Sequence, residues 1–114
     1  LARAYPVLRG AARFYLDFLV EDPRTGHLVT APSNSPENTF RTEDGQVAHT
    51  CAGPVIDIQI VRELFANTAA AARLLGLDPD LAGKMDAARA KLPPHRIGRH
   101  GQLQEWQIDY DEPE

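Results

Sequence analysis

The sequence has 114 residues, close to the modal size of a single domain. Apolar residues make up 43% and charged residues 25%, so the chain can build a modest core and is not disordered as a whole. The net charge of −4 argues against a nucleic-acid partner, which would favour a basic surface. No apolar run approaches the ~20 residues of a bilayer-spanning helix, and a single cysteine allows neither an internal disulfide nor a cysteine-rich zinc site.

Residues 1–20 have the spacing of an amphipathic helix. Apolar side chains recur at every third or fourth position, at Leu1, Tyr5, Leu8, Ala12, Tyr15 and Leu19. Pro6 lies inside this pattern, so either the regular helix begins near Pro6 or it is kinked there. The chain opens in mid-helix, without an initiator methionine or a signal-peptide pattern, and we therefore expect it to be a fragment of a longer protein.

The segment from residue 24 to residue 52 reads as turns, short strands and loop. Thr25-Gly26 suggests a tight turn, and residues 28–30 are β-prone but long enough only for one edge of a small ribbon. Residues 30–38 contain two prolines, two serines and two asparagines, which excludes a helix interior and predicts a stiffened loop around Glu37. Residues 39–49 carry the hairpin turn signal Glu43-Asp44-Gly45 and predict a small two-stranded excursion or loop.

The strongest helical pattern covers residues 55–75. Its predicted apolar face consists of Ile56, Ile60, Val61, Leu64, Phe65, Thr68, Ala71, Ala72 and Leu75. Gly76 is expected to end this helix, and Asp78 followed by Pro79 predicts the N-cap and first residue of another. That helix would bury Leu81, Met85, Ala88 and Leu92 and stop at Pro93-Pro94, and residues 95–114 would be loop-like. We therefore predict an all-α chain of antiparallel helices with long polar loops and a short β-hairpin.

Four stretches of the sequence resemble one known family. They are Tyr5-Pro6-Val7-Leu8-Arg9-Gly10-Ala11-Ala12, residues 30–38 with Ser35-Pro36-Glu37-Asn38, residues 57–65 with Arg62-Glu63-Leu64-Phe65, and Gly98-Arg99-His100-Gly101-Gln102-Leu103-Gln104-Glu105-Trp106. In this order they resemble glycoside hydrolase family 95, the α-L-fucosidases, some members of which act on α-L-galactosides. The resemblance extends from Tyr5 to Glu114 and implies that residues 1–114 are about a third of an (α/α)6 toroid, incomplete at both ends.

The resemblance also implies a mechanism. Enzymes of this family invert the anomeric configuration, with a glutamate as general acid, and the resemblance assigns that role to Glu37. The water is activated by two asparagines supported by an aspartate, expected before Leu1 and after Glu114, and a His-Arg-His motif is expected just past Glu114. Because these groups lie outside the 114 residues, we expect the isolated fragment to be inactive.

Two carboxylates compete for the acid role. Glu37 follows Pro36 in the stiffened loop, and burial there would raise its pKa toward the working pH. The residues alone favour a surface turn, with Glu37 as a helix-dipole partner, and it is the family resemblance that makes Glu37 the preferred acid. Glu105 lies beside Trp106, whose ring could carry the apolar face of a sugar, although the pair could also be an anchored loop. We interpret Glu105 and Trp106 as sugar contacts without a catalytic role.

Four further residues are predicted to bind the substrate: Asn34, Asn38, Asp57 and His100. Asp57 could point into the central pocket of the toroid or could simply stabilise the helix dipole. The four histidines match no zinc spacing, so no metal and no cofactor is expected. Ser33 and Ser35 lack the glycine-flanked elbow of a serine nucleophile, and that role is excluded.

The sequence thus predicts a fragment of an inverting glycosidase that releases terminal α-L-fucose or α-L-galactose from glycans. The alternative is a non-catalytic helical module that binds glycans or proteins through the same loops. A third possibility is a structural fragment that self-associates, because part of a toroid exposes apolar helix faces. A glycan substrate would favour a periplasmic or secreted enzyme, and neither a nucleic acid nor a membrane is expected as a partner.

Overall fold

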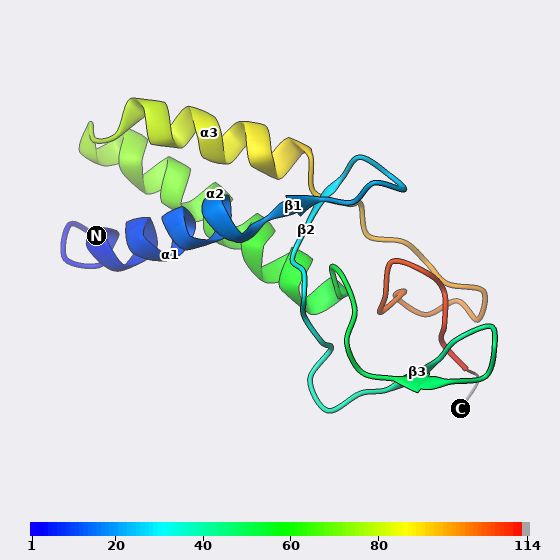
Figure 1. Cartoon of the computed structure of the whole chain (residues 1–114). Helices are drawn as coiled ribbons and strands as arrows, with labels where there is room; N and C mark the ends of the chain where they lie inside the picture. The colour runs from blue at the N-terminus through cyan, green and yellow to red at the C-terminus, as the bar shows by residue number, and fades with distance from the viewer. Residues whose placement is uncertain (113–114) are drawn as a thin grey trace.

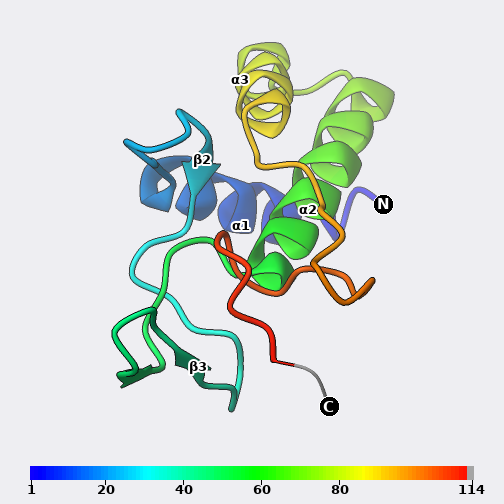
Figure 2. The ribbon, with the colours of Figure 1, turned by 90° about the vertical axis from the view of Figure 1, so that its right-hand side faces the viewer.

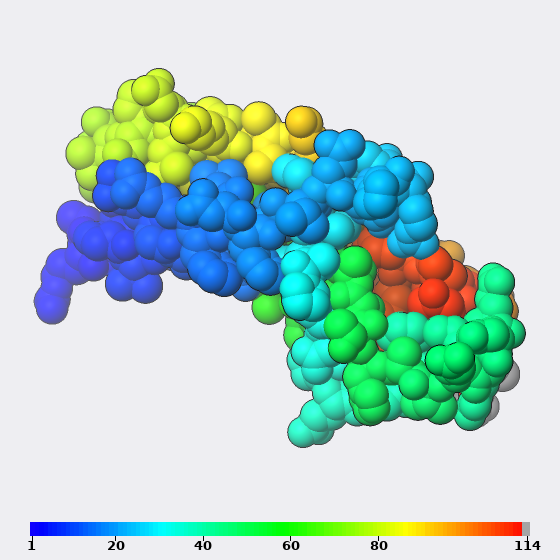
Figure 3. Space-filling model, viewed as in Figure 1, coloured from blue at the N-terminus to red at the C-terminus, as the bar shows by residue number. Residues whose placement is uncertain are grey.

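The protein is elongated, with its helices at one end and loops at the other. A computed structural model describes residues 1–112 as three helices and two antiparallel hairpins, with extents of 51 × 27 × 21 Å. The helices pack side by side, while the second hairpin and the C-terminal segment form a separate lobe (Figures 1 and 3). This largely helical arrangement confirms the predicted order of helix, loops and two further helices. None of the helices in residues 1–112 is both long and apolar enough to cross a membrane.

Helix α1 spans Tyr5–Phe18 and leads directly into the first hairpin. Pro6 occupies the first turn, where a missing backbone donor costs nothing, so the first of the two predicted readings of this proline is confirmed. Strand β1, Val20–Glu21, pairs with strand β2, Leu28–Val29, in the register Val20↔Val29. The chain therefore reverses directly behind α1 and enters the proline-rich loop from the helical end of the molecule.

The second hairpin belongs to the other lobe. Strand β3, Phe40–Arg41, pairs with strand β4, Val47–Ala48, in the register Phe40↔Ala48. The predicted turn at Glu43-Asp44-Gly45 lies between these strands, where Gly45 has a φ of 82°. The two-stranded excursion predicted for residues 39–49 is therefore confirmed.

Helix α2 spans Val55–Leu75 and α3 spans Pro79–Ala90, as the sequence predicted to within two residues. Gly76 ends α2 in the left-handed region, with a φ of 66°. Asp78 stands at the N-cap of α3, but its side chain does not cap the helix. It accepts a hydrogen bond of 2.7 Å from the Tyr5 hydroxyl and pairs with Arg9 at 2.8 Å. The residue predicted to cap α3 therefore links α3 to α1 instead.

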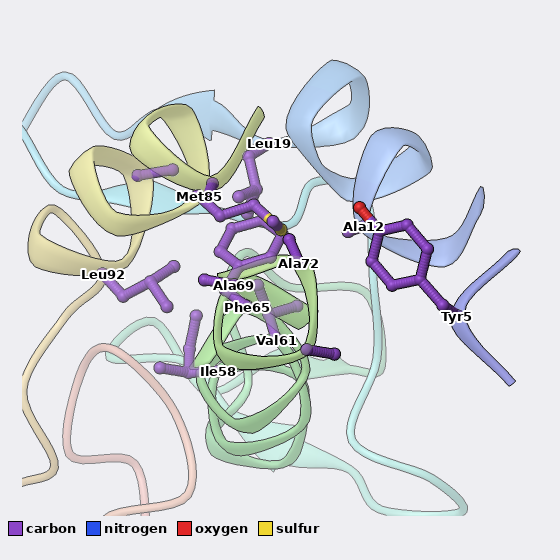
Figure 4. Close-up of a cluster of buried hydrophobic side chains, with 13 residues drawn as sticks. Tyr5, Ala12, Leu19, Ile58, Val61, Phe65, Ala69, Ala72, Met85 and Leu92 are labelled. Carbon is purple, nitrogen blue, oxygen red and sulfur yellow. The ribbon is translucent and has the colours of Figure 1, made fainter. Parts of the chain in front are cut away.

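The hydrophobic core lies where α2 packs against both α1 and α3 (Figure 4). Its buried side chains are Tyr5, Ala12, Leu19, Ile58, Val61, Phe65, Ala69, Ala71, Ala72, Ala82, Met85, Ala88 and Leu92. The predicted face of α2 is wrong at its first turns, because Ile56 and Ile60 are 36% and 50% exposed whereas Ile58 is 1% exposed. Figure 2 shows α1 and α3 next to α2, and the buried side chains of α2 belong to the core that the three helices form.

A buried carboxylate organises the turn between β1 and β2. Asp22 is 5% exposed and accepts hydrogen bonds from the backbone and the guanidinium of Arg24, at 2.9 and 3.1 Å. The Asp22 carbonyl accepts two more, from the N–H groups of Thr25 and Gly26. The hydrogen bonds from Arg24 hold the pKa of the Asp22 carboxyl below its usual range.

The isoleucines of α2 offer a matched test of the core. We expect Ile58→Ala to lower the free energy of unfolding of this chain by about 2–5 kcal/mol, because it removes packed methyl groups from a closed core. Ile60→Ala should change it by less than about 0.5 kcal/mol, because that side chain is half exposed. Urea unfolding followed by circular dichroism measures both changes, and equal losses would contradict the assigned face of α2.

The stability of the chain should depend on pH through the Asp22 carboxyl. Because the folded-state pKa of Asp22 is depressed, its stabilising effect is present above the unfolded pKa of about 3.9 and is lost as the pH falls through the folded value. We expect Asp22→Asn to lower the free energy of unfolding by about 1 kcal/mol at pH 7 and by progressively less below pH 4. Urea midpoints across this range test the trend, with the exposed Asp17→Asn as control. A deficit that does not shrink at low pH would count against it.

Candidate functional site

A cavity in the loop lobe lies between the second hairpin and the C-terminal segment. Its volume is about 630 Å³. The loop and hairpin contribute Asn38, Thr39, Phe40, Arg41 and Val47, and the C-terminal segment contributes His100, Gln102, Leu103, Glu105, Trp106, Tyr110, Asp111 and Glu112. The two contributing segments lie against each other in Figure 3, where the C-terminal residues are red and the hairpin is green. A cavity of this size is within the range of small-molecule sites.

An aromatic cluster forms one wall of the cavity. The rings of Phe40 and Tyr110 stack with centroids 4.5 Å apart and an interplanar angle of 10°, and Phe40 meets Trp106 at 5.3 Å. Such contacts add to the apolar area that is buried, so they hold the C-terminal segment on β3. Trp106 is 6% exposed, and its indole N–H has no hydrogen-bond partner within the described part of the chain. The indole nitrogen is itself buried, so Trp106 presents little surface to a ligand in the cavity.

Glu37 is exposed and is not among the residues that line the cavity. Its φ of 61° is in the left-handed region, which is uncommon for a residue with a Cβ. A backbone bond of 3.1 Å from Asn38 to Ser35 closes the turn that contains it. The next residue, Asn38, lines the cavity. Glu37 is thus an exposed residue that directly precedes one lining the cavity.

Asn38 and Glu105 join the Glu37 loop to the C-terminal segment. The Asn38 side-chain amide donates to the Glu105 carboxylate at 2.6 Å. Glu105 is itself fixed to α2, because its carbonyl accepts the Val55 N–H at 2.8 Å. A second link, 2.7 Å from the Gln107 amide to the Gly53 carbonyl, runs beside it. The C-terminal segment that lines the cavity is therefore attached to the start of α2 at Glu105 and Gln107.

The other end of the loop is held by Asp57, in the first turn of α2. A single carboxylate oxygen, Oδ2, accepts hydrogen bonds from the hydroxyls of Thr30 and Ser33, each at 2.6 Å. Ser33 also forms a two-way backbone bridge with Cys51, at 2.8 and 2.9 Å. Burial raises the pKa of the Cys51 thiol, and the nearby carboxylates of Asp57 and Glu105 raise it further.

Gly53 marks the closest approach between the loop strand and the start of α2. Its φ is 58°, and a Cβ at this position would lie 2.8 Å from a Val29 methyl carbon. The Gly53 N–H donates to the Thr30 carbonyl at 2.8 Å. A side chain here would force the two segments apart, so the position requires glycine.

The predicted site residues divide into two groups. Asn38, His100, Glu105 and Trp106 all line the cavity, whereas Asn34, Glu37 and Asp57 do not. Asn34 is exposed, and Asp57 is occupied by two hydroxyls. Sequence reasoning missed Phe40 and Tyr110, which form the aromatic wall. Both could have been found as aromatic residues close to predicted site residues, since Phe40 is two positions after Asn38 and Tyr110 is four positions after Trp106.

The cavity carries charge of both signs. Arg41 lines it together with Glu105, Asp111 and Glu112, and Arg41 approaches Glu112 at 3.7 Å. Within residues 1–112, no group of three or more histidine, cysteine, aspartate or glutamate side chains is arranged to hold a metal ion. The site therefore offers hydrogen-bond donors and acceptors beside an aromatic surface, which suits a polyhydroxylated ligand.

The tryptophan provides a probe of this wall, because it is the only one in the chain. We expect Phe40→Ala to shift the Trp106 emission to longer wavelength and to increase its quenching by acrylamide, since the ring that packs against Trp106 at 5.3 Å is lost. Phe14→Ala serves as the matched control, because Phe14 contacts Tyr15 and Phe18 on α1. Unchanged emission and quenching in the Phe40 variant would contradict the proposed packing.

Comparison with known proteins gives a consistent result. The model of the "Glycosyl hydrolase family 95 catalytic domain" matches residues 1–114. Alpha-L-fucosidase 2 of Arabidopsis thaliana is 42% identical over 113 residues, which cover 98% of this chain and 13% of that protein. Probable alpha-fucosidase A of Aspergillus niger is 36% identical over 115 residues, covering 94% of this chain and 13% of that protein.

The extent of these matches decides the family. The family model covers every residue of the chain, and the two curated relatives align along nearly all of it, although the chain spans only about an eighth of their length. The resemblance seen in the four sequence motifs is therefore confirmed, and the chain belongs to the glycosyl hydrolase family 95 catalytic domain.

Proposed function

We propose that this chain is part of the catalytic domain of an inverting α-L-fucosidase, with Glu37 as the general acid. The full-length protein would release terminal α-L-fucose, or α-L-galactose, from glycans. The observation that carries the proposal is the family match across residues 1–114, which includes the Ser35-Pro36-Glu37-Asn38 motif. The names of both relatives, each an α-fucosidase, support the choice of substrate.

The geometry around Glu37 is compatible with this role. Its neighbour Asn38 lines a cavity that has an aromatic wall and is hydrogen-bonded to Glu105, which lines the same cavity. A glycan would thus lie in the cavity between the hairpin and the C-terminal segment, with its scissile bond toward Glu37.

The proposed reaction needs one proton and one water. Glu37 gives its proton to the glycosidic oxygen as the bond from that oxygen to the anomeric carbon breaks. A water adds to the opposite face of the anomeric carbon and passes its own proton to a base, so the configuration inverts. The groups that activate the water are the asparagine pair and the aspartate that the family resemblance implies, and they lie outside these 114 residues.

The general acid must be shielded, and here Glu37 is exposed. We propose that further segments of the (α/α)6 domain cover it and complete the cavity, raising its pKa by burial. The large apolar side chains that are exposed on the helices support an incomplete domain, since they would be covered in the same way. The most exposed of these are Val7, Phe14, Ile60 and Leu74.

A leaving-group comparison tests the acid. In the full-length protein, we expect Glu37→Gln to lower kcat about 10²–10⁴-fold on a fucosylated oligosaccharide, whose alcohol leaving group needs a proton. An aryl α-L-fucoside with an acidic phenol should be affected far less, because that group leaves without assistance. Steady-state kinetics on both substrates gives the contrast, and proton NMR of the first sugar released should show the β-anomer.

Glu43→Gln is the matched control for this experiment, because Glu43 is exposed in the β3–β4 turn and does not line the cavity. Near-normal turnover of the oligosaccharide by the Glu37 variant would remove Glu37 from the role. Equal losses on both substrates would point to binding instead of proton donation. A full-length protein that binds fucosylated glycans without hydrolysing them would favour the alternative of a glycan-binding module.

A further inference from the structure

We infer that Asp57 is a positioning residue, whose carboxylate sets the direction in which the loop carries Glu37. The inference rests on the proposed role of Glu37. Asp57 lies outside the cavity, and its Oδ2 atom already accepts hydrogen bonds of 2.6 Å from Thr30 and Ser33. It therefore acts on the reaction through the loop and does not contact the substrate.

The contacts of Asp57 fix the beginning of the loop to the helix. Thr30 is 1% exposed, and Gly53 holds its carbonyl at 2.8 Å. Ser33 is bridged to Cys51 by two backbone bonds. Both backbone partners directly precede α2, and Asp57 is followed on that helix by the core residue Ile58. The start of the loop is thus attached by hydrogen bonds to the beginning of α2, the helix that carries most of the core.

Glu37 lies between two carboxylate anchors. It lies four positions after Ser33, which Asp57 holds, and directly before Asn38, which Glu105 holds. Between these points Glu37 adopts a φ of 61°, a conformation that a residue with a Cβ keeps only when its surroundings impose it. Removing the Asp57 carboxylate would free the residues that precede this turn, and the Glu37 carboxyl would no longer be held in one direction.

A carboxylate suits this position for two reasons. One ionised oxygen can accept two hydroxyl protons at the short distances typical of charge-assisted bonds. The first turn of α2 also favours a negative charge, because the unpaired N–H groups of the helix point toward it. Asparagine can offer a carbonyl oxygen in the same place, so Asp57→Asn keeps the geometry with weaker bonds, whereas Asp57→Ala removes the acceptor altogether.

The test compares the two substrates introduced above, in the full-length protein. We expect Asp57→Ala to lower kcat on the fucosylated oligosaccharide about 100-fold, the cost of a misplacement of roughly 1 Å, with a much smaller effect on the aryl α-L-fucoside. Asp57→Asn should restore most of the loss. In a Glu37→Gln background, Asp57→Ala should add little, because two residues that act through one step are not additive. Asp80→Ala, which removes a first-turn carboxylate from α3, is the matched control and should leave both rates unchanged.

The outcomes separate this inference from the proposed function. If Glu37→Gln shows the leaving-group contrast and Asp57→Ala does not, the inference is overturned and the acid assignment stands. If Glu37→Gln shows no contrast, the proposed function fails and the inference fails with it. A loss in Asp57→Asn as large as in Asp57→Ala, on both substrates alike, would place Asp57 against the substrate and overturn its role in positioning.

A variant that removes one donor at a time covers the case in which Asp57→Ala does not fold. Ser33→Ala and Thr30→Val each leave Asp57 and one of its hydroxyl partners in place. Each should show the same leaving-group contrast in a milder form, with a circular dichroism spectrum like that of the unmodified protein. Folded single variants whose rates on both substrates are unchanged would overturn the inference.

Discussion

The burial of one face of α2 against α1 and α3 is the interaction on which the rest of the structure depends. Phe65 and Val61, in the middle of that face, have no exposed surface. Because the helix is fixed there, its first turn can act as a rigid support for loops that have little core of their own. The Glu105 carbonyl, the Asp57 carboxylate and the backbone of Gly53 all connect the loop lobe to that end of the helix.

The site is accordingly built from segments that are far apart in the sequence. The loop around Glu37 and the segment around Trp106 are separated by both later helices, yet Asn38 and Glu105 are in direct contact. Neither segment contributes to the helical core cluster. The shape of the cavity therefore depends on the hydrogen bonds to α2 and on the stack of Phe40 on Tyr110, because the two segments have no part in the hydrophobic core.

Local signals in the sequence predicted the helices well, and non-local contacts account for what they missed. Gly76 and Pro79 mark the end of α2 and the start of α3 through their own backbone preferences, which need no partner. The buried face of α2 was misassigned because the helix is apolar on more than one side. Periodicity then cannot tell whether Ile58 or Ile60 meets a neighbour. Asp78 was predicted as a cap, but Tyr5 is 73 residues away and takes its carboxylate.

The same distinction holds for the site. The proline-rich loop could be predicted from composition, and its family motif pointed to Glu37, but the partners of the loop could not, since Asp57 and Glu105 follow it by tens of residues. The aromatic wall could not be predicted from the sequence for a similar reason. Nothing near Phe40 in the sequence indicates that Tyr110 will stack on it, because that contact forms only after the second hairpin and the C-terminal segment have met.

Gly53 has a consequence for how this chain can vary during evolution. Two separate demands fall on the position, a left-handed backbone and a lack of room beside Val29. A smaller neighbour at position 29 could relieve only the second of them, so no compensating change elsewhere makes a side chain there harmless. Among homologous sequences, this glycine should persist even where the surrounding loop has diverged.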